Sequence, residues 1–190
     1  MTSTYTSIAY AAWVLVLLIW IPGYFTSRKA VRVEKPLLQV ATTSLIALAF
    51  ALLFLRRLPG ALGGRISEAP VAVALLADLV CLGGVLFAIW ARLTLGHNWS
   101  GALASLGHNH ELVRSGPYRY VRHPIYAGFL VAMLATAVTI GTLASYLAVA
   151  VGLVAFLLRI WLEETLLQAQ FPDAYGVYKK ETAALIPGLY

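Results

Sequence analysis

Long uninterrupted apolar stretches constrain this chain more than any other feature of its sequence. They cover approximately residues 8–24, 37–55, 71–95 and 125–162, and each of the first three is near the roughly 20 residues that a membrane-spanning helix needs. Of the 190 residues, 61% are hydrophobic and only 12% are charged, against roughly 25% charged in an ordinary soluble domain. A soluble core of this length could not enclose so much apolar surface. The sequence therefore predicts an integral membrane protein.

The fourth apolar stretch is about twice the length of one span, and Gly141 lies near its middle. Because glycine allows a tight turn between two helices, we predict that this stretch forms a helical hairpin. The predicted fold class is all-α: a polytopic integral membrane protein with about five transmembrane helices, the last two forming the hairpin, and a polar cap on one side. We expect one domain over residues 1–190, with three spans in 1–95 and the polar loop, hairpin and tail in 96–190.

The 14 Lys and Arg residues are spread unevenly over the loops of this topology. Most fall in the first and third loops and at the C-terminal end, while the second loop holds Arg56, Arg57 and Arg65. The positive-inside rule then predicts an N-terminus outside and a cytoplasmic third loop and C-terminus. It also explains the net charge of +6 without any nucleic-acid partner. The two most polar regions, 96–123 and 163–190, would share one side and could form one site.

The third loop concentrates side chains that can carry chemistry, including all four histidines of the chain. Residues 115–118 signal a turn, and Pro124 suits the first turn of a helix. Backbone N–H groups at the start of that helix, with Arg122 and His123 beside them, favour an anionic group such as a carboxylate or phosphate. The simpler alternative is an interfacial aromatic belt whose arginines bind lipid headgroups.

A second polar cluster, Arg159, Glu163 and Glu164, lies at the end of the last span. Arg159 and Glu163 are four residues apart and share a helix face. Arg159 lies about one turn inside the apolar stretch, where an ionisable residue is costly and is a candidate for function. The simpler alternative is a snorkelling arginine with a local ion pair. We predict no metal site, because the loop histidines have no Cys or Asp beside them, and we expect mid-span Asp78 to be hydrogen-bonded to a neighbouring helix or protonated.

Together, the two clusters resemble the isoprenylcysteine carboxyl methyltransferase family of membrane methyltransferases, which is similar in motif to phospholipid N-methyltransferases. The resemblance covers about the C-terminal half of the chain, and the first three spans match only as hydrophobic helices. The residues that carry it are His110-Glu111-Leu112-Val113, Gly116-Pro117-Tyr118, Arg122-His123-Pro124-Ile125-Tyr126, Arg159, Glu163-Glu164, Phe171, Tyr175 and Tyr178.

The resemblance implies an S-adenosylmethionine site between the third loop and the end of the last helix. It implies that Arg159, Glu163 and Glu164 are the catalytic residues, with Arg159 facing the substrate. By the same analogy, the residues that bind the cofactor are His110, Glu111, Leu112, Val113, Tyr118, His123, Pro124, Ile125, Tyr126 and Glu163.

The implied reaction is carboxyl O-methylation of an isoprenylcysteine-like lipophilic substrate that enters from the bilayer. Transfer to a carboxylate needs alignment and desolvation more than a strong base, and the planar fork of Arg159 suits a carboxylate. An amine acceptor would have to lose a proton, for which Glu163 or Glu164 is the candidate base. Alternatives are a methyltransferase for a phospholipid amine or small thiol, a non-enzymatic lipid-binding or transport protein, and a membrane reductase of the sterol type.

Overall fold

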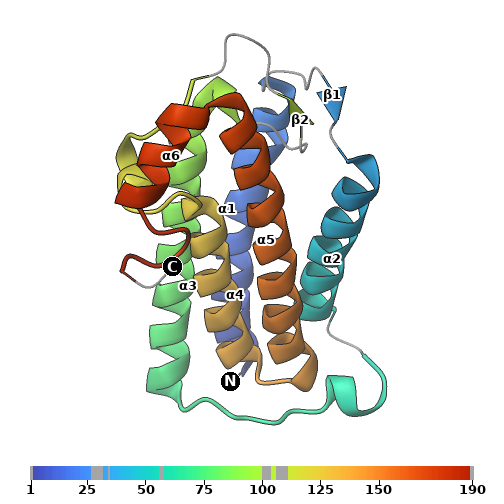
Figure 1. The fold of residues 1–190 in the computed structure, drawn as a ribbon. Helices are drawn as coiled ribbons and strands as arrows, with labels where there is room; N and C mark the ends of the chain where they lie inside the picture. The colour runs from blue at the N-terminus through green and yellow to red at the C-terminus, as the bar shows by residue number, and fades with distance from the viewer. Residues whose placement is uncertain are drawn as a thin grey trace.

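Five long apolar helices and a short sixth helix form the fold in a computed structural model of the chain (Figure 1). This count refers to the residues that the structure describes, which are 2–26, 32–33, 35–55, 58–99, 104–105 and 111–188. The α-helices are α1 (Thr2–Thr26), α2 (Pro36–Phe54), α3 (Val71–Leu95), α4 (Pro124–Ile140), α5 (Leu143–Gln170) and α6 (Pro172–Glu181). The shorter elements are β1 (Arg32–Val33), β2 (Ala104–Ser105), η1 (Gly60–Gly63), η2 (Gly96–Asn98) and η3 (Gly116–Arg119).

Four of the long helices, α1, α2, α3 and α5, are long and apolar enough to cross a membrane. The chain is therefore a multi-pass integral membrane protein. The fifth, α4, is apolar but has 17 residues. At 1.5 Å per residue this is roughly 26 Å, slightly less than the ~30 Å hydrocarbon core of a bilayer.

The predicted helical hairpin is confirmed at the turn between α4 and α5. Gly141 ends α4 with a φ of 71°, which favours glycine, and a Cβ there would lie 2.2 Å from the carbonyl oxygen of Ser67. Thr142 then caps α5, because its side chain accepts a hydrogen bond from the backbone N–H of Ser145 and the Ser145 hydroxyl bonds back to Thr142 N. A turn of two residues thus joins the helices.

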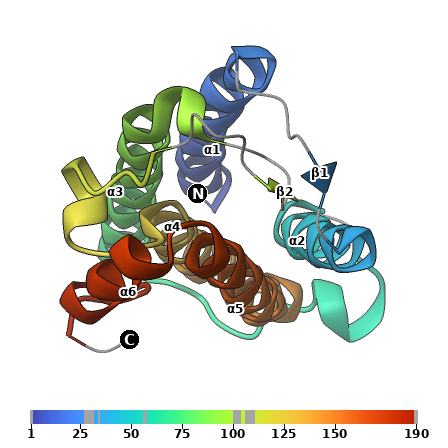
Figure 2. The ribbon, with the colours of Figure 1, turned by 45° about the horizontal axis from the view of Figure 1, so that its top comes forward.

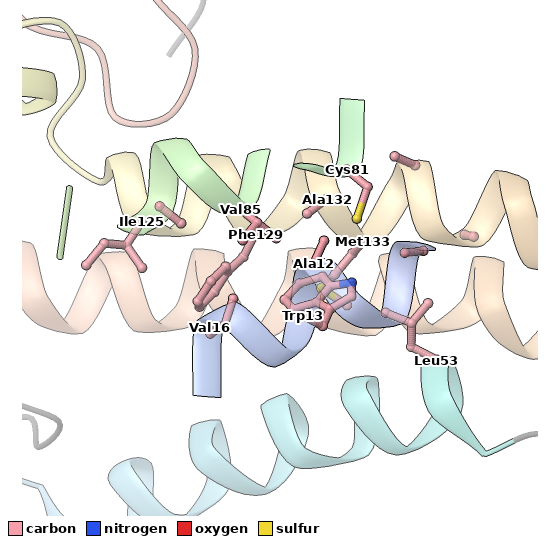
Figure 3. Close-up of a cluster of buried hydrophobic side chains, with 14 of the residues drawn as sticks. Ala12, Trp13, Val16, Leu53, Cys81, Val85, Ile125, Phe129, Ala132 and Met133 are labelled. Carbon is pink, nitrogen blue, oxygen red and sulfur yellow. The ribbon is translucent and has the colours of Figure 1, made fainter. Parts of the chain in front are cut away.

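The helices pack through small residues. A Cβ at Gly84 in α3 would lie 2.7 Å from the carbonyl oxygen of Gly128 in α4, so these two helices meet backbone to backbone. Such contacts suit a bundle in lipid, where close packing replaces the hydrophobic driving force. Around this contact, Trp13 of α1 reaches across the bundle and its indole N–H donates to the Thr136 hydroxyl of α4 at 3.0 Å. Figure 3 shows Trp13 beside Phe129 and Met133 in the buried cluster.

The chain order brings the polar segments to one end of the bundle. In Figure 1, the N-terminus and the α4–α5 turn lie at the lower end, whereas α6 and the starts of α2 and α4 lie at the upper end. Figure 2 looks toward that upper end, where α6 lies beside α4 and α5. The prediction that the third loop and the C-terminal tail share one side is confirmed, since Arg122 N donates to Ala183 O at 2.9 Å.

Three features differ from the expected purely helical hairpin architecture. A two-residue antiparallel pair, β1 with β2, joins the first loop to the third. The last long helix continues to Gln170, well past the end of the apolar stretch. A short polar helix, α6, follows it. These features lie outside the apolar segments, where hydropathy gives no signal.

Asp78 of α3 is 4% exposed and accepts a long hydrogen bond from Thr139 of α4 at 3.4 Å, as expected.

Candidate active site

Glu163 connects α5 with the start of α4 at the polar end of the bundle. Its Oε1 accepts hydrogen bonds from Arg159 Nε at 3.1 Å and from the Tyr126 hydroxyl. Its Oε2 lies 3.6 Å from His123 Nδ1. The Arg159 side chain is 7% exposed and that of Glu163 is 27% exposed, so Glu163 is less deeply buried than the guanidinium that it binds.

Arg159 is fixed from a second direction by α2. Its Nη1 donates to Gln39 Oε1 at 3.3 Å. With Glu163 on one side and Gln39 on the other, the guanidinium plane has a defined orientation within the bundle. Such positioning is what a planar, bidentate donor needs if it is to orient a carboxylate.

Glu164 points to a different set of cations. Its Oε1 accepts from Arg122 Nε at 2.8 Å, its Oε2 lies 2.7 Å from Lys179 Nζ, and His123 Nε2 is 3.4 Å from Oε1. The Glu164 side chain is 12% exposed. Glu164 therefore joins the third loop, α5 and α6, whereas Glu163 faces the interior of the bundle.

His123 lies between the two carboxylates, with a side chain 5% exposed. Burial by itself would lower the pKa of His123, but its hydrogen bonds to Glu163 and Glu164 and their negative charges outweigh that effect and raise the pKa above its ordinary value. The imidazole is thus biased toward its protonated form, in which it bridges two negative side chains.

Aromatic rings line the apolar side of this polar cluster. The Tyr126 ring stacks on Phe156, with centroids 4.9 Å apart and planes 18° apart, and on His123, with centroids 5.9 Å and planes 12° apart. Phe129 lies one turn further into the bundle and contacts Phe156 and Trp20. The polar cluster therefore opens onto an aromatic interior and not onto a further polar region.

Hydrogen bonds from the C-terminal segment stabilise the irregular segment 118–123, which leads into α4. His123 N donates to Ala184 O at 3.0 Å, next to the Arg122–Ala183 bond. The Tyr178 hydroxyl donates to Tyr118 O at 2.6 Å, and the Arg122 guanidinium donates to Thr182 O. Each bond satisfies a backbone group of an irregular segment that would otherwise be buried without a partner.

The structure brings together five of the residues singled out in the sequence: His123, Tyr126, Arg159, Glu163 and Glu164. Tyr118 is buried nearby, where burial first, and then the charge of Glu163, raise its pKa well above the ordinary value, against a smaller opposite effect of Arg92.

The other predicted cofactor residues lie around this group. Pro124 and Ile125 are buried in the first turn of α4. Val113 packs partly buried against the core, and Leu112 is half-buried. Glu111 is exposed, and among the described residues it has no hydrogen bond or ion pair. His110 lies outside the described residues.

The anion expected at the start of α4 is supplied by the chain itself. Arg122 and His123 contact the carboxylates of Glu164 and Glu163. Sequence reasoning did not assign Gln39 or Lys179 to the site. Gln39 had a signal, because it is the one amide side chain of α2, whose other polar residues are small hydroxyl residues. Lys179 lies in a polar tail where nothing distinguishes it from its neighbour Lys180.

The fold and this site define a polytopic helical membrane protein with a charged, aromatic-lined centre at one end of its bundle. A profile of the isoprenylcysteine carboxyl methyltransferase (ICMT) family matches residues 75–169, which is half of the chain and runs from α3 into α5. The chain belongs to this family. The predicted resemblance is confirmed, and it extends into α3.

Two relatives and one solved structure are similar to the chain. It is 37% identical over 110 residues to protein-S-isoprenylcysteine O-methyltransferase of Schizosaccharomyces pombe, covering 57% of this chain and 46% of the relative. It is 43% identical over 70 residues to methanethiol S-methyltransferase 1 of Bradyrhizobium diazoefficiens, covering 37% and 24%. The structure of the eukaryotic intramembrane Ras methyltransferase ICMT shares the fold, with a TM-score of 0.58 and 24% identity over 84% of this chain and 55% of that one. The chain thus spans about half the length, or less, of these proteins.

Proposed function

We propose that this chain is an S-adenosylmethionine-dependent membrane methyltransferase that methylates the carboxyl oxygen of an isoprenylcysteine-like lipophilic acceptor. The observation that carries the proposal is the shared carboxylate of Glu163, which contacts Arg159, Tyr126 and His123 at the boundary between charged and aromatic surfaces. Family membership adds support, because the matched region contains all four residues.

The residues present fit S-adenosylmethionine. The Glu163 side chain is 27% exposed and carries a negative charge, which suits an ammonium group. When bound, the cofactor supplies an electrophilic methyl group on a good leaving group.

The protein's own part in this reaction is alignment and exclusion of water. Arg159, oriented by Glu163 and Gln39, would bind the acceptor carboxylate and direct one oxygen toward the methyl group. Phe129 and Phe156 would surround the lipophilic part of the acceptor and keep water out. Because a carboxylate is already an anion, this reaction requires no general base, and effective positioning accounts for a large share of the rate.

A thiol acceptor is the second candidate, favoured by the similarity to the methanethiol S-methyltransferase. A thiol or a phospholipid amine must lose a proton. Glu163 is the better placed acceptor for that proton, because Glu164 is held by both Arg122 and Lys179. The site would then use the same residues with a different role for Glu163.

We further propose that α4 crosses the membrane with the other four helices. It begins at the polar end of the bundle and ends at the turn on the opposite end (Figure 1), and a few ångströms of mismatch cost little. With five spans, the distribution of basic residues supports an N-terminus outside and a cytoplasmic site and C-terminus.

Calorimetric titration of the detergent-purified protein with S-adenosylmethionine and S-adenosylhomocysteine tests the proposal. Saturable binding of both is expected. Labelled methyl transfer is then measured to N-acetyl-S-farnesyl-L-cysteine, methanethiol and phosphatidylethanolamine vesicles, and a base-labile product identifies a carboxyl ester. The Arg159→Ala variant should keep cofactor binding and lose transfer to the carboxylate. Absence of binding by the folded wild-type protein would favour a non-enzymatic headgroup-binding role.

A further inference from the structure

Within the part of the chain that the structure describes, one buried arginine outside the Glu163 cluster has no acidic partner. Arg92 lies in the last turn of α3 and is 4% exposed. Its Nη2 donates to Gly23 O of α1 at 2.9 Å and its Nη1 to Gly96 O at 3.1 Å. The guanidinium lies over the Trp99 ring, 4.2 Å from the centroid. An ionisable residue in a membrane-spanning helix is costly and usually serves a function.

The contacts of Arg92 leave its positive charge without a full negative counterpart. Within the described part of the chain, its partners are two neutral carbonyls and an aromatic ring, and Nε is buried with no hydrogen-bond partner. The other buried arginine of the core, Arg159, has Glu163. A buried charge that lacks an ion-pair partner costs several kcal/mol, so an anionic ligand would relieve a cost that the protein alone leaves in place.

Arg92 belongs to α3, the helix against which the segment with Tyr118 packs. The segment η3 packs on α3, and Tyr118 belongs to the same buried cluster as Tyr126 and Trp99. Tyr118 is close enough to both Glu163 and Arg92 for each charge to affect its pKa, in opposite directions. A carboxylate and a guanidinium thus both lie within electrostatic range of one tyrosine, and a zwitterionic amino acid carries the two complementary groups.

We propose that Arg92 binds the carboxylate of the methionine moiety of S-adenosylmethionine, while Glu163 receives the ammonium group. The proposal rests on the proposed function and names a binding residue that the motifs of the third loop and α5 do not include. Charge-assisted hydrogen bonds between a guanidinium and a carboxylate are among the stronger ones in proteins. Trp99 and the two carbonyls fix the guanidinium before the ligand arrives, which lowers the entropy cost of binding.

The competing explanation is a structural clamp. Gly23 is in the last turn of α1 and Gly96 follows α3, so Arg92 also joins two helix C-termini, where a cation is favourable. If Arg92 is a structural clamp, its loss should change the affinity for every ligand of the site by a similar factor, or for none. A carboxylate-binding residue would affect only ligands that carry the carboxylate, and a pair of ligands therefore separates the two roles.

The test compares S-adenosylhomocysteine with 5′-methylthioadenosine, which keeps the nucleoside and sulfur but lacks the amino-acid end. Both are titrated calorimetrically into the wild-type protein, into Arg92→Met and Arg92→Lys, and into Arg119→Met as the matched control. Arg119 is exposed in η3. The Lys variant keeps the charge and serves if loss of the clamp prevents Arg92→Met from folding.

Arg92→Met is expected to weaken S-adenosylhomocysteine binding roughly 10- to 100-fold and to leave 5′-methylthioadenosine binding within about twofold of the wild-type value. Arg92→Lys should fall between the wild type and Arg92→Met, and Arg119→Met should match the wild type. An equal loss for both ligands, or no loss for either, overturns the proposal in favour of a clamp. If the folded wild-type protein binds neither ligand, the proposed function itself fails.

Discussion

Replacing Glu163 with glutamine removes one charge from the site and keeps its shape. Arg159 then loses its anionic partner and retains a neutral oxygen at position 163 together with Gln39 Oε1 at 3.3 Å. Breaking a fully buried ion pair costs about 3–5 kcal/mol. Because the Glu163 side chain is 27% exposed and glutamine can still accept a hydrogen bond, we expect a loss of about 2 kcal/mol.

The assay is thermal unfolding of the detergent-purified protein, followed by tryptophan fluorescence. A loss of about 2 kcal/mol corresponds to a fall of roughly 4–8 °C in Tm for a chain of this size. Calorimetric titration with S-adenosylhomocysteine should show affinity weakened by roughly 10- to 150-fold, because the ammonium group loses a charged partner. Glu181→Gln is the control, since Glu181 is 61% exposed and 3.9 Å from Arg114, and its Tm should change little.

The two measurements separate a structural role of Glu163 from a role in cofactor binding. A lower Tm with unchanged affinity for S-adenosylhomocysteine would make Glu163 a structural partner of Arg159 and would remove it from the cofactor site. An unchanged Tm would refute the inference that Arg159 depends on this carboxylate for its stability in the bundle.

Three further changes probe the packing and the charge of the site. Gly84→Ala should destabilise the protein by about 1–3 kcal/mol, because its Cβ would lie 2.7 Å from Gly128 O; a lower Tm is the readout. Tyr178→Phe should cost about 1 kcal/mol in the same assay, because the hydroxyl loses its bond to Tyr118 O. Since the folded-state pKa of His123 is raised, its stabilising contribution is complete below its ordinary pKa of about 6.5 and should be lost as the pH rises through the higher value.

Neighbouring positions provide the controls. A Cβ at Gly83 would have no atom within 4 Å, so Gly83→Ala should leave Tm nearly unchanged. Tyr120 is 60% exposed, and Tyr120→Phe should be neutral. The variant His123→Gln should flatten the dependence of Tm on pH above about 6.5; a slope that persists in this variant would assign it to another group.

Hydropathy predicted the bounds of a helix well where the helix begins and ends with its apolar stretch. The stretch 71–95 is the same as α3, since its apolar residues begin and end with the helix. The prediction for α5 ended at residue 162, whereas the helix continues to Gln170. Its last two turns are polar, so hydropathy marked the edge of the apolar segment and not the end of the helix. The segment α6 was missed for the same reason.

Only contacts between residues close together in one helix could be predicted for the candidate site. The pairing of Arg159 with Glu163 follows from a separation of one helical turn, and the structure has it. The partners of Glu164 come from the third loop and from α6, which no periodicity relates. Likewise, Gln39 approaches Arg159 only because α2 packs on α5, a contact between segments more than a hundred residues apart.

The pairing of helices also determines how this bundle can assemble. The main partner of α2 is α5, and α1 packs chiefly on α3, so neither of the first two helices finds its principal partner in the helix made next. During membrane insertion, α2 therefore enters the lipid before its main partner, α5, has been inserted. Its sequence permits this, because Pro36–Phe54 contains no charged residue. A nascent chain that stops after α4 would therefore leave α2 as a stable but unanchored helix, and the site would form only in the last stage of biogenesis.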